Sequence, residues 1–179
     1  MRVPFAIELS FDESADAAVR TVWDRLDQAG VTTLAAPFRP HASLAVIEDG
    51  DPDELWEELA EPVRSCLGIP LTLAALGFFL TDEAVAFLHV VPTAGLLDCH
   101  RRVIAACSAE PPRLWPYYGI DRLVPHCTLA TGLRDGDGAK VVETLAQCRL
   151  PISAHIAMGA LVEVPGGHTL RSVGRPGPR

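Results

Sequence analysis

A four-residue pattern that occurs twice carries the side chains best suited to chemistry in this chain. It reads His, any residue, Ser or Thr, then Leu, and is formed by residues 41–44 and 126–129. Each copy follows a proline and opens an apolar run, which is typical of a β-strand. Because side chains two residues apart in a strand project to the same face, each copy would present one imidazole and one hydroxyl to the same surface.

The repetition distinguishes these two histidines from the rest. The chain has six histidines, and the other four have no Ser or Thr two residues further on. For one copy alone, an ordinary strand histidine that donates to a backbone carbonyl is the better interpretation. Two copies in matching contexts favour a functional pair.

Two imidazoles and two hydroxyls can together move protons at a phosphate. A neutral imidazole takes a proton from the attacking water or hydroxyl, and a protonated one gives a proton to the leaving oxygen. The hydroxyls of Ser43 and Thr128 can donate hydrogen bonds to the non-bridging oxygens. In-line displacement requires base and acid on opposite sides of the phosphorus, so we expect His41 and His126 to face each other across a cleft.

Local signals predict the elements that position these residues. Strands are expected over residues 5–11, 41–47, 71–80, 85–91, 126–131, 151–164 and 168–173. Helices are expected over residues 12–29, 51–67, 93–107 and 138–147, with starts at the capping residues Asp12 or Ser14, Asp51 and Thr93. Pro62 is expected to break or kink the second helix. Trp23 and Trp56 are expected in the core, and His100 at the edge of an apolar helix face.

The order strand, helix, loop, motif strand, helix, strand occurs in both halves of the chain. This indicates an internal duplication and an α+β fold of antiparallel sheets flanked by helices. We expect one domain over residues 1–173, made of two lobes at about 1–80 and 84–173 that can exchange elements. Each lobe would give one motif strand to a central cleft. Residues 174–179 are predicted to be a flexible tail.

Composition indicates a soluble globular protein. The chain has 179 residues, of which 49% are hydrophobic and 21% charged. It contains no apolar run long enough to span a membrane, and its first residues lack the pattern of a signal peptide. We therefore expect a cytoplasmic protein, and a monomer, because no pattern marks a dimer face.

The five cysteines are widely spaced and form no C-x-x-C pair, so neither a zinc site nor a redox pair is indicated. We expect reduced, mostly buried thiols. Cys127 stands next to His126, but neighbours in a strand face opposite ways, which disfavours a nucleophile and its base.

The net charge of −8 disfavours binding to the phosphate backbone of long duplex nucleic acid. Charge is unevenly spread, however, since residues 101–134 hold five arginines against two acids. A local anion site suits a small or terminal phosphate, although a randomly uneven surface is an equal alternative.

The paired motifs resemble those of the 2H phosphoesterase superfamily, and within it the bacterial group of 2′-5′ RNA ligases and RNA 2′,3′-cyclic phosphodiesterases. The similarity covers most of the chain, including residues 39–44, 76–79, 85–91 and 124–129. The resemblance implies an enzyme without metal or cofactor that opens 2′,3′-cyclic phosphates on nucleotides or RNA ends. In most relatives the product carries a 2′-phosphate. Some members of the group also make or cleave 2′-5′ linkages. The resemblance also implies His41 as general acid and His126 as general base.

The positive, aromatic loop before the second motif is the candidate for substrate contacts. Tyr117 and Tyr118 can stack on a base, and Arg122 or Arg134 can pair with phosphate. Arg39, just before the first motif, is a further candidate. The alternative is that the aromatic residues anchor the loop on the protein surface.

Other functions stay open at the level of sequence. A protein of the same fold can bind a nucleotide or RNA end without cleaving it, and another small cyclic phosphate or a 2′-5′ oligonucleotide needs the same four groups. A metal site on the two histidines is disfavoured, because neither motif has a nearby carboxylate in sequence.

Overall fold

The computed structural model describes residues 4–34, 36–107 and 114–174, which form an α+β fold. Its strands are β1 (Phe5–Phe11), β2 (His41–Ile47), β3 (Pro70–Phe79), β4 (Val85–Val90), β5 (His126–Ala130), β6 (Ile152–Glu163) and β7 (His168–Gly174). Its helices are α1 (Glu13–Gln28), α2 (Pro52–Arg64), α3 (Ala94–Ala106), α4 (Asp137–Ala146) and the short 3₁₀-helix η1 (Pro116–Tyr118). The predicted fold class is confirmed, and each histidine motif begins a strand.

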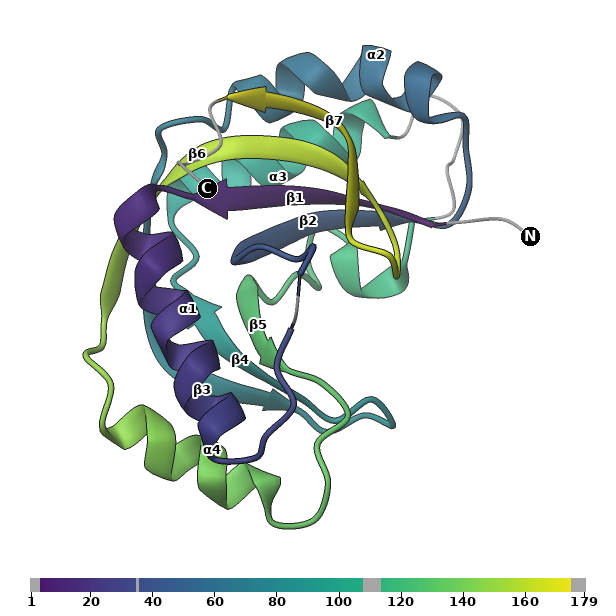
Figure 1. Ribbon diagram of the computed structural model, residues 1–179. Helices are drawn as coiled ribbons and strands as arrows, with labels where there is room; N and C mark the ends of the chain where they lie inside the picture. Colours follow the sequence, from purple (N-terminus) through teal and green to yellow (C-terminus); the bar gives the residue numbers. More distant parts are fainter. Residues whose placement is uncertain (1–3, 35, 108–113, 175–179) are drawn as a thin grey trace.

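The strands form one antiparallel sheet in the order β2-β1-β6-β3-β4-β5, with β7 paired to β6. The long strand β6 joins its two parts, because residues 152–155 pair with β3 and residues 156–163 pair with β1. Although β2 and β5 stand at opposite ends of this order, they lie side by side in the middle of the molecule (Figure 1). The sheet therefore curves until its two outermost strands meet.

The helices cover the two parts of this curved sheet in pairs. Helices α2 and α3 pack on each other and against the part that contains β2, β6 and β7, whereas α1 and α4 pack together beside β5 (Figure 1). The apolar side chains of α1 recur at helical spacing and are buried; they are Ala15, Val19, Val22, Trp23 and Leu26. Trp23 is thus a core residue as predicted, and Trp56 is partly buried against the core.

The helix starts predicted from capping residues are confirmed, and Pro62, expected to break or kink the second helix, does not break it. Asp12, Asp51 and Thr93 each accept a hydrogen bond from a backbone N–H in the first turn of the following helix. Helix α2, however, continues through Pro62 to Arg64. Proline has no backbone N–H to donate to the carbonyl four residues earlier, so α2 continues through this position with one hydrogen bond fewer.

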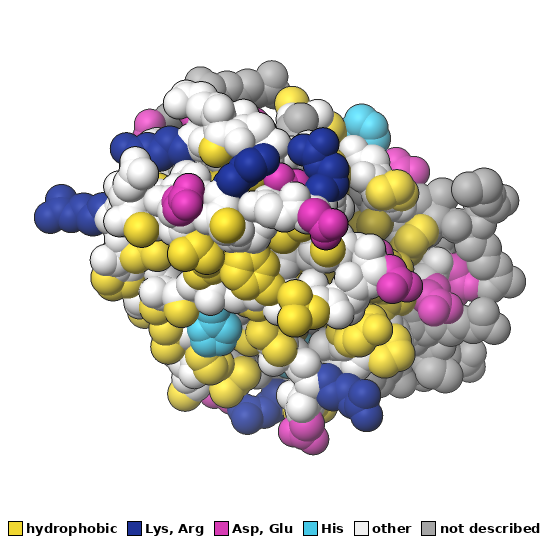
Figure 2. All heavy atoms as spheres, turned by 90° about the horizontal axis from the view of Figure 1, so that it is seen from below, with side chains coloured by type: hydrophobic (Ala, Val, Ile, Leu, Met, Phe, Trp, Pro, Cys, Tyr) yellow, Lys and Arg dark blue, Asp and Glu magenta, His cyan; other side chains and the backbone are white. Residues whose placement is uncertain are grey.

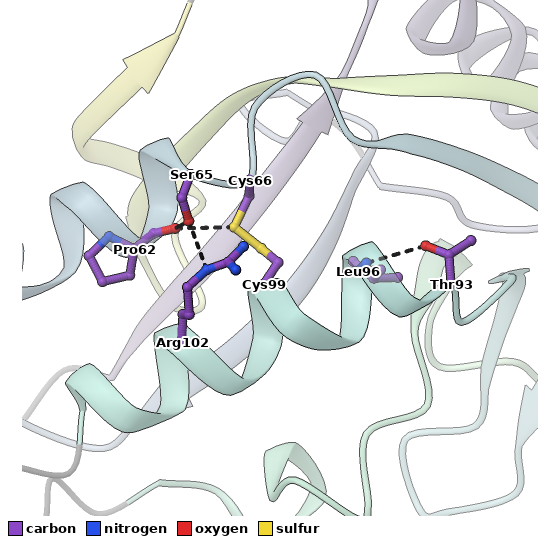
Figure 3. Close-up of a disulfide and its surroundings, with 7 residues drawn as sticks. All are labelled: Pro62, Ser65, Cys66, Thr93, Leu96, Cys99 and Arg102. Atoms are coloured by element: carbon purple, nitrogen blue, oxygen red, sulfur yellow. Dashed lines mark hydrogen bonds between the residues drawn. A yellow bond between two sulfur atoms is a disulfide. The ribbon is translucent and has the colours of Figure 1, made fainter.

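A disulfide between Cys66 and Cys99 contradicts the expectation that all five thiols are reduced (Figure 3). Cys66 follows α2 and Cys99 lies in α3, and both are fully buried. The two cysteines are separated by 33 residues, so only the packing of α2 on α3 makes them neighbours. Cys107 and Cys127 are buried free thiols, and Cys148 is partly buried.

None of the helices that the structure describes is long and apolar enough to cross a membrane. Seen from below, hydrophobic side chains gather across the middle of the molecule, and lysines and arginines lie toward its edges (Figure 2). Among large hydrophobic side chains, Leu80 and Tyr117 are the most exposed of those described, at 93% and 71%.

We expect the disulfide to stabilise the fold. A cross-link that closes a loop of 33 residues contributes about 3–4 kcal/mol by restricting the unfolded chain. The double variant Cys66→Ala/Cys99→Ala should therefore unfold at a clearly lower urea concentration than the oxidised native protein. Alkylation under denaturing, non-reducing conditions should label three thiols, and labelling of five would contradict the cross-link.

Candidate active site

The first motif pairs with the strand β1 in an antiparallel register that shifts between Ile7 and Glu8. Ser43 lies opposite Glu8, and His41 lies opposite Ser10. All four side chains therefore project from the same face of the β1–β2 pair. The residue between them in the motif, Ala42, points the other way and is buried.

The second motif has the same register against β4. Thr128 lies opposite Phe87, and His126 lies opposite His89. Cys127, between them, is buried on the other face, and burial raises the pKa of its thiol to about 12. As the alternation of the strand predicted, this thiol is not placed as a nucleophile beside His126.

Both imidazoles are held by the same local hydrogen bond. Nδ1 of His41 donates to the carbonyl of Arg39 at 2.7 Å, and Nδ1 of His126 donates to the carbonyl of Val124 at 2.7 Å. A carbonyl can only accept, so Nδ1 carries the proton in each ring. Each Nε2 is then left either to accept a proton or to donate one.

Contacts between β2 and β5 bring the two motifs together. The thiol of Cys127 lies within hydrogen-bonding reach of the backbone of His41. The indole Nε1 of Trp23, on α1, donates to the carbonyl of Thr128 at 3.2 Å. The charge of His41 also contributes to lowering the pKa of His126, so the two rings lie within electrostatic range of each other.

A cavity of about 480 Å³ opens beside the second motif. His126 and Thr128 line it together with Tyr117, Tyr118 and Arg122. Its other walls come from the β3–β4 turn with its flanking residues, the η1 region and the end of β5; they are Phe79, Thr81, Asp82, Glu83, Val85, Trp115, Leu123, Val124 and Thr131. The structure thus brings five of the nine predicted site residues to one cavity.

Tyr118 connects this cavity to the first motif. Its hydroxyl shares a hydrogen bond with the side chain of Ser43, and its carbonyl bonds with Nε2 of the buried His100 at 2.9 Å. Burial raises the pKa of the Tyr118 hydroxyl, against the effect of Ser43. His100, predicted at the edge of a helix face, is fully buried and instead anchors the loop that carries Tyr118.

The surroundings of the two imidazoles differ in polarity, and His41 has a carboxylate beside it. Nε2 of His41 lies 3.4 Å from Oε1 of Glu8, and each side chain is only 12% exposed. Burial raises the pKa of Glu8, and the charge of His41 opposes that shift. Glu8 was not predicted as a site residue, although it interrupts an otherwise apolar strand, and that interruption is the signal that could have identified it.

His126 has aromatic rings beside it. Its ring centroid lies 4.9 Å from that of Phe79, edge to face, and 5.2 Å from that of Phe87. Gly77 makes room for this arrangement, because a Cβ at that position would overlap the ring of Phe87. Burial lowers the pKa of His126 below its ordinary value, and the charges of His41 and His89 lower it further, against the bond to the Val124 carbonyl.

The remaining predicted arginines are placed differently. Arg134 bonds with Asp137 at the start of α4 and donates to the carbonyl of Gly30 at 3.3 Å, away from the cavity lining. Arg39 offers its carbonyl to His41, but its side chain is not among the cavity-lining residues. Of the three arginines proposed for substrate, only Arg122 lines the cavity.

Metal ligands do not gather in the part of the chain that the structure describes. Among those residues, no group of three or more His, Cys, Asp or Glu side chains is placed to hold a metal ion. The two motifs at β2 and β5 supply two imidazoles, each with an Nε2 that its backbone bond leaves available, and two hydroxyls.

A family model identifies the chain. The model of the 2′-5′ RNA ligase superfamily matches residues 11–166, and the chain belongs to this family, the 2H phosphoesterases. Membership places it among phosphoesterase enzymes. None of the curated proteins matches the chain in sequence.

Several solved structures share the fold of this chain. The protein TT0787 of Thermus thermophilus is 18% identical with a TM-score of 0.68, and all of both chains is covered. LigT of E. coli complexed with 3′-AMP is 16% identical with a TM-score of 0.61, over 98% of this chain and 94% of that one. Usb1 of Kluyveromyces marxianus with uridine monophosphate is 13% identical with a TM-score of 0.51, over 97% and 98%. At these identities the similarity shows the fold.

We expect His126 to titrate below the ordinary histidine value of 6.5, because its buried aromatic surroundings disfavour the charged ring. Histidine NMR on the native protein, with His126→Ala to assign the signal, measures this directly. Below pH 6.5 the unfolded chain then binds more protons at this residue than the folded protein does. The free energy of unfolding is therefore unaffected by His126 well above pH 6.5 and decreases as the pH falls below that value. A titration midpoint at or above 6.5 would contradict this expectation.

Proposed function

We propose that the protein is a phosphodiesterase that opens 2′,3′-cyclic phosphates on nucleotides or at RNA ends by two-histidine acid–base catalysis. The observation that carries the proposal is the pair of imidazoles on adjoining strands, each oriented by the same Nδ1 bond and each with its Nε2 left for proton transfer. Family membership supports phosphoester chemistry, and the nucleotides bound by LigT and Usb1 support a nucleotide or RNA end as substrate.

The proposed roles follow from the surroundings of each ring. Burial among aromatic neighbours lowers the pKa of His126, which favours its neutral form. In the proposed mechanism its Nε2 takes a proton from water as the water oxygen attacks phosphorus. The bond from phosphorus to one ribose oxygen breaks, and that oxygen takes the proton from Nε2 of His41. His126 ends protonated and His41 neutral, and exchange with solvent restores both.

The hydroxyls of the two motifs complete the proposed site. Ser43 and Thr128 project from the same faces as the histidines and can donate to the non-bridging oxygens, where charge concentrates during displacement. Tyr117, exposed at the cavity, offers a ring on which a base can stack, and Arg122 offers a positive charge for phosphate. Regiochemistry follows from which ribose oxygen faces His41.

The first experiment is hydrolysis of a 2′,3′-cyclic nucleotide and of a short RNA with a cyclic-phosphate end, in excess EDTA. We expect turnover by the native protein and a loss of at least about 1000-fold in kcat for His41→Ala and His126→Ala, since each removes a proton-transfer group. Phosphorus NMR of the product identifies the oxygen that retains the phosphate. His168→Ala, a histidine exposed on β7, is the matched control.

The outcomes separate the proposal from its rivals. Binding of the nucleotide without turnover by the native protein would favour a binding module. Turnover that EDTA abolishes, or that survives both histidine variants, would contradict two-histidine catalysis.

We expect Ser43→Ala and Thr128→Ala each to lower kcat by about 100-fold, the usual effect of removing one donor to a developing oxyanion. The effect should fall on kcat more than on KM, because the donors bind the transition state more strongly than the substrate. Thr169→Ala, an exposed hydroxyl on β7, serves as the control. A loss confined to KM in both variants would place the hydroxyls in ground-state binding only.

A further inference from the structure

The two motifs are matched in register, and their cross-strand partners are not. Opposite the motif hydroxyl stands Glu8 in the first copy and Phe87 in the second. At the intervening position both copies have a fully buried leucine, Leu9 or Leu88. The backbone framework is therefore the same, and the side chain beside the imidazole is a carboxylate in one copy and an aromatic ring in the other.

We infer that Glu8 is a positioning residue that makes His41 the proton donor, and that Phe87, at the equivalent position, makes His126 the proton acceptor. The inference rests on the proposed function and assigns the direction of proton transfer within it. Its basis is geometric: Oε1 of Glu8 lies 3.4 Å from Nε2 of His41, and the ring of Phe87 lies 5.2 Å from that of His126.

The carboxylate acts through the imidazole that it contacts. Oε1 of Glu8 lies 3.4 Å from Nε2 of His41, and a charge interaction at this distance is weakened little by solvent because both side chains are largely shielded from water. The carboxyl group also binds a proton more readily than usual, since burial raises the pKa of Glu8. Replacing this carboxyl group is therefore expected to change proton transfer at Nε2 of His41.

Other titratable groups around the rings do not reproduce this difference. The groups that face His41 are Glu8 from β1 and His126 from β5. Tyr118 from η1 hydrogen-bonds with Ser43, and the charge of Glu8 raises the pKa of its hydroxyl. Facing His126 are His41 and His89, which both disfavour its charged form. The cavity is also lined by the charged or titratable side chains Asp82, Glu83, Tyr117 and Arg122. Among all these described groups, only Glu8 forms an ion-pair contact with either imidazole.

The test is the pH dependence of kcat/KM on the cyclic nucleotide for the native protein, Glu8→Gln, Glu8→Asp and the control Glu13→Gln, which removes an exposed carboxylate of α1. For Glu8→Gln we expect the alkaline limb to move to lower pH by about one unit. The acidic limb, set by the base, should stay in place. Glu8→Asp should restore part of the shift, and Glu13→Gln should leave both limbs unchanged.

Two results would overturn the inference. An equal loss of rate at every pH, with both limbs in place, would give Glu8 a structural role only. A shift of the acidic limb would instead make His41 the base. Circular dichroism and the NMR spectrum of Glu8→Gln establish that it is folded.

A second measurement keeps the inference testable if the native protein does not cleave the cyclic nucleotide. Because the charge of His41 lowers the pKa of Glu8, carbon NMR of the Glu8 carboxyl group should show a higher midpoint in His41→Ala than in the native protein. An unchanged midpoint would show that the pair is not coupled and would overturn the inference. A raised midpoint without turnover would leave the pair standing and count against the proposed function alone.

Discussion

The site depends on one constraint, that the two outermost strands of a single curved sheet meet. β2 and β5 are separated by the whole strand order, yet the thiol of Cys127 reaches the backbone of His41 and Trp23 holds the carbonyl of Thr128. β6 makes this possible because its two ends pair with different strands, β3 and β1. If the sheet were flat, the two motifs would lie far apart, and neither could act on the same phosphate.

The two motif strands are alike, but different side chains surround them, and this explains how a repeated motif can supply both a proton donor and a proton acceptor in the proposed mechanism. The backbone bond at Nδ1 is the same in both copies, so orientation comes from the motif and its preceding proline. The neighbours of the two rings differ: Glu8 of the adjoining strand β1 lies beside His41, whereas Phe87 of the adjoining strand β4 and Phe79 of β3 lie beside His126. The chemistry that we propose therefore uses the duplicated framework for geometry and the differences between its halves for charge.

The loop before the second motif is tied to the fold from two sides. His100 bonds with the carbonyl of Tyr118, and Tyr118 in turn contacts Ser43. The neighbouring residue on the same helix, Cys99, carries the disulfide to Cys66 beyond α2. Helix α3 thus carries both a disulfide in the core and the hydrogen bond to the loop that forms one wall of the cavity.

The sequence by itself determined the local features: the capped helix starts at Asp12, Asp51 and Thr93, and the motif strands with their alternating faces. Each follows from hydrogen bonds or side-chain directions within a few residues. Tertiary structure alone decided the curvature that joins β2 and β5, the pairing of Cys66 with Cys99, and the placement of Glu8 and Phe87 beside the two imidazoles. It also turned Arg134 toward Asp137 and away from the cavity. These are contacts between segments distant in the chain, and no local pattern encodes which strands become neighbours or what a side chain meets across them.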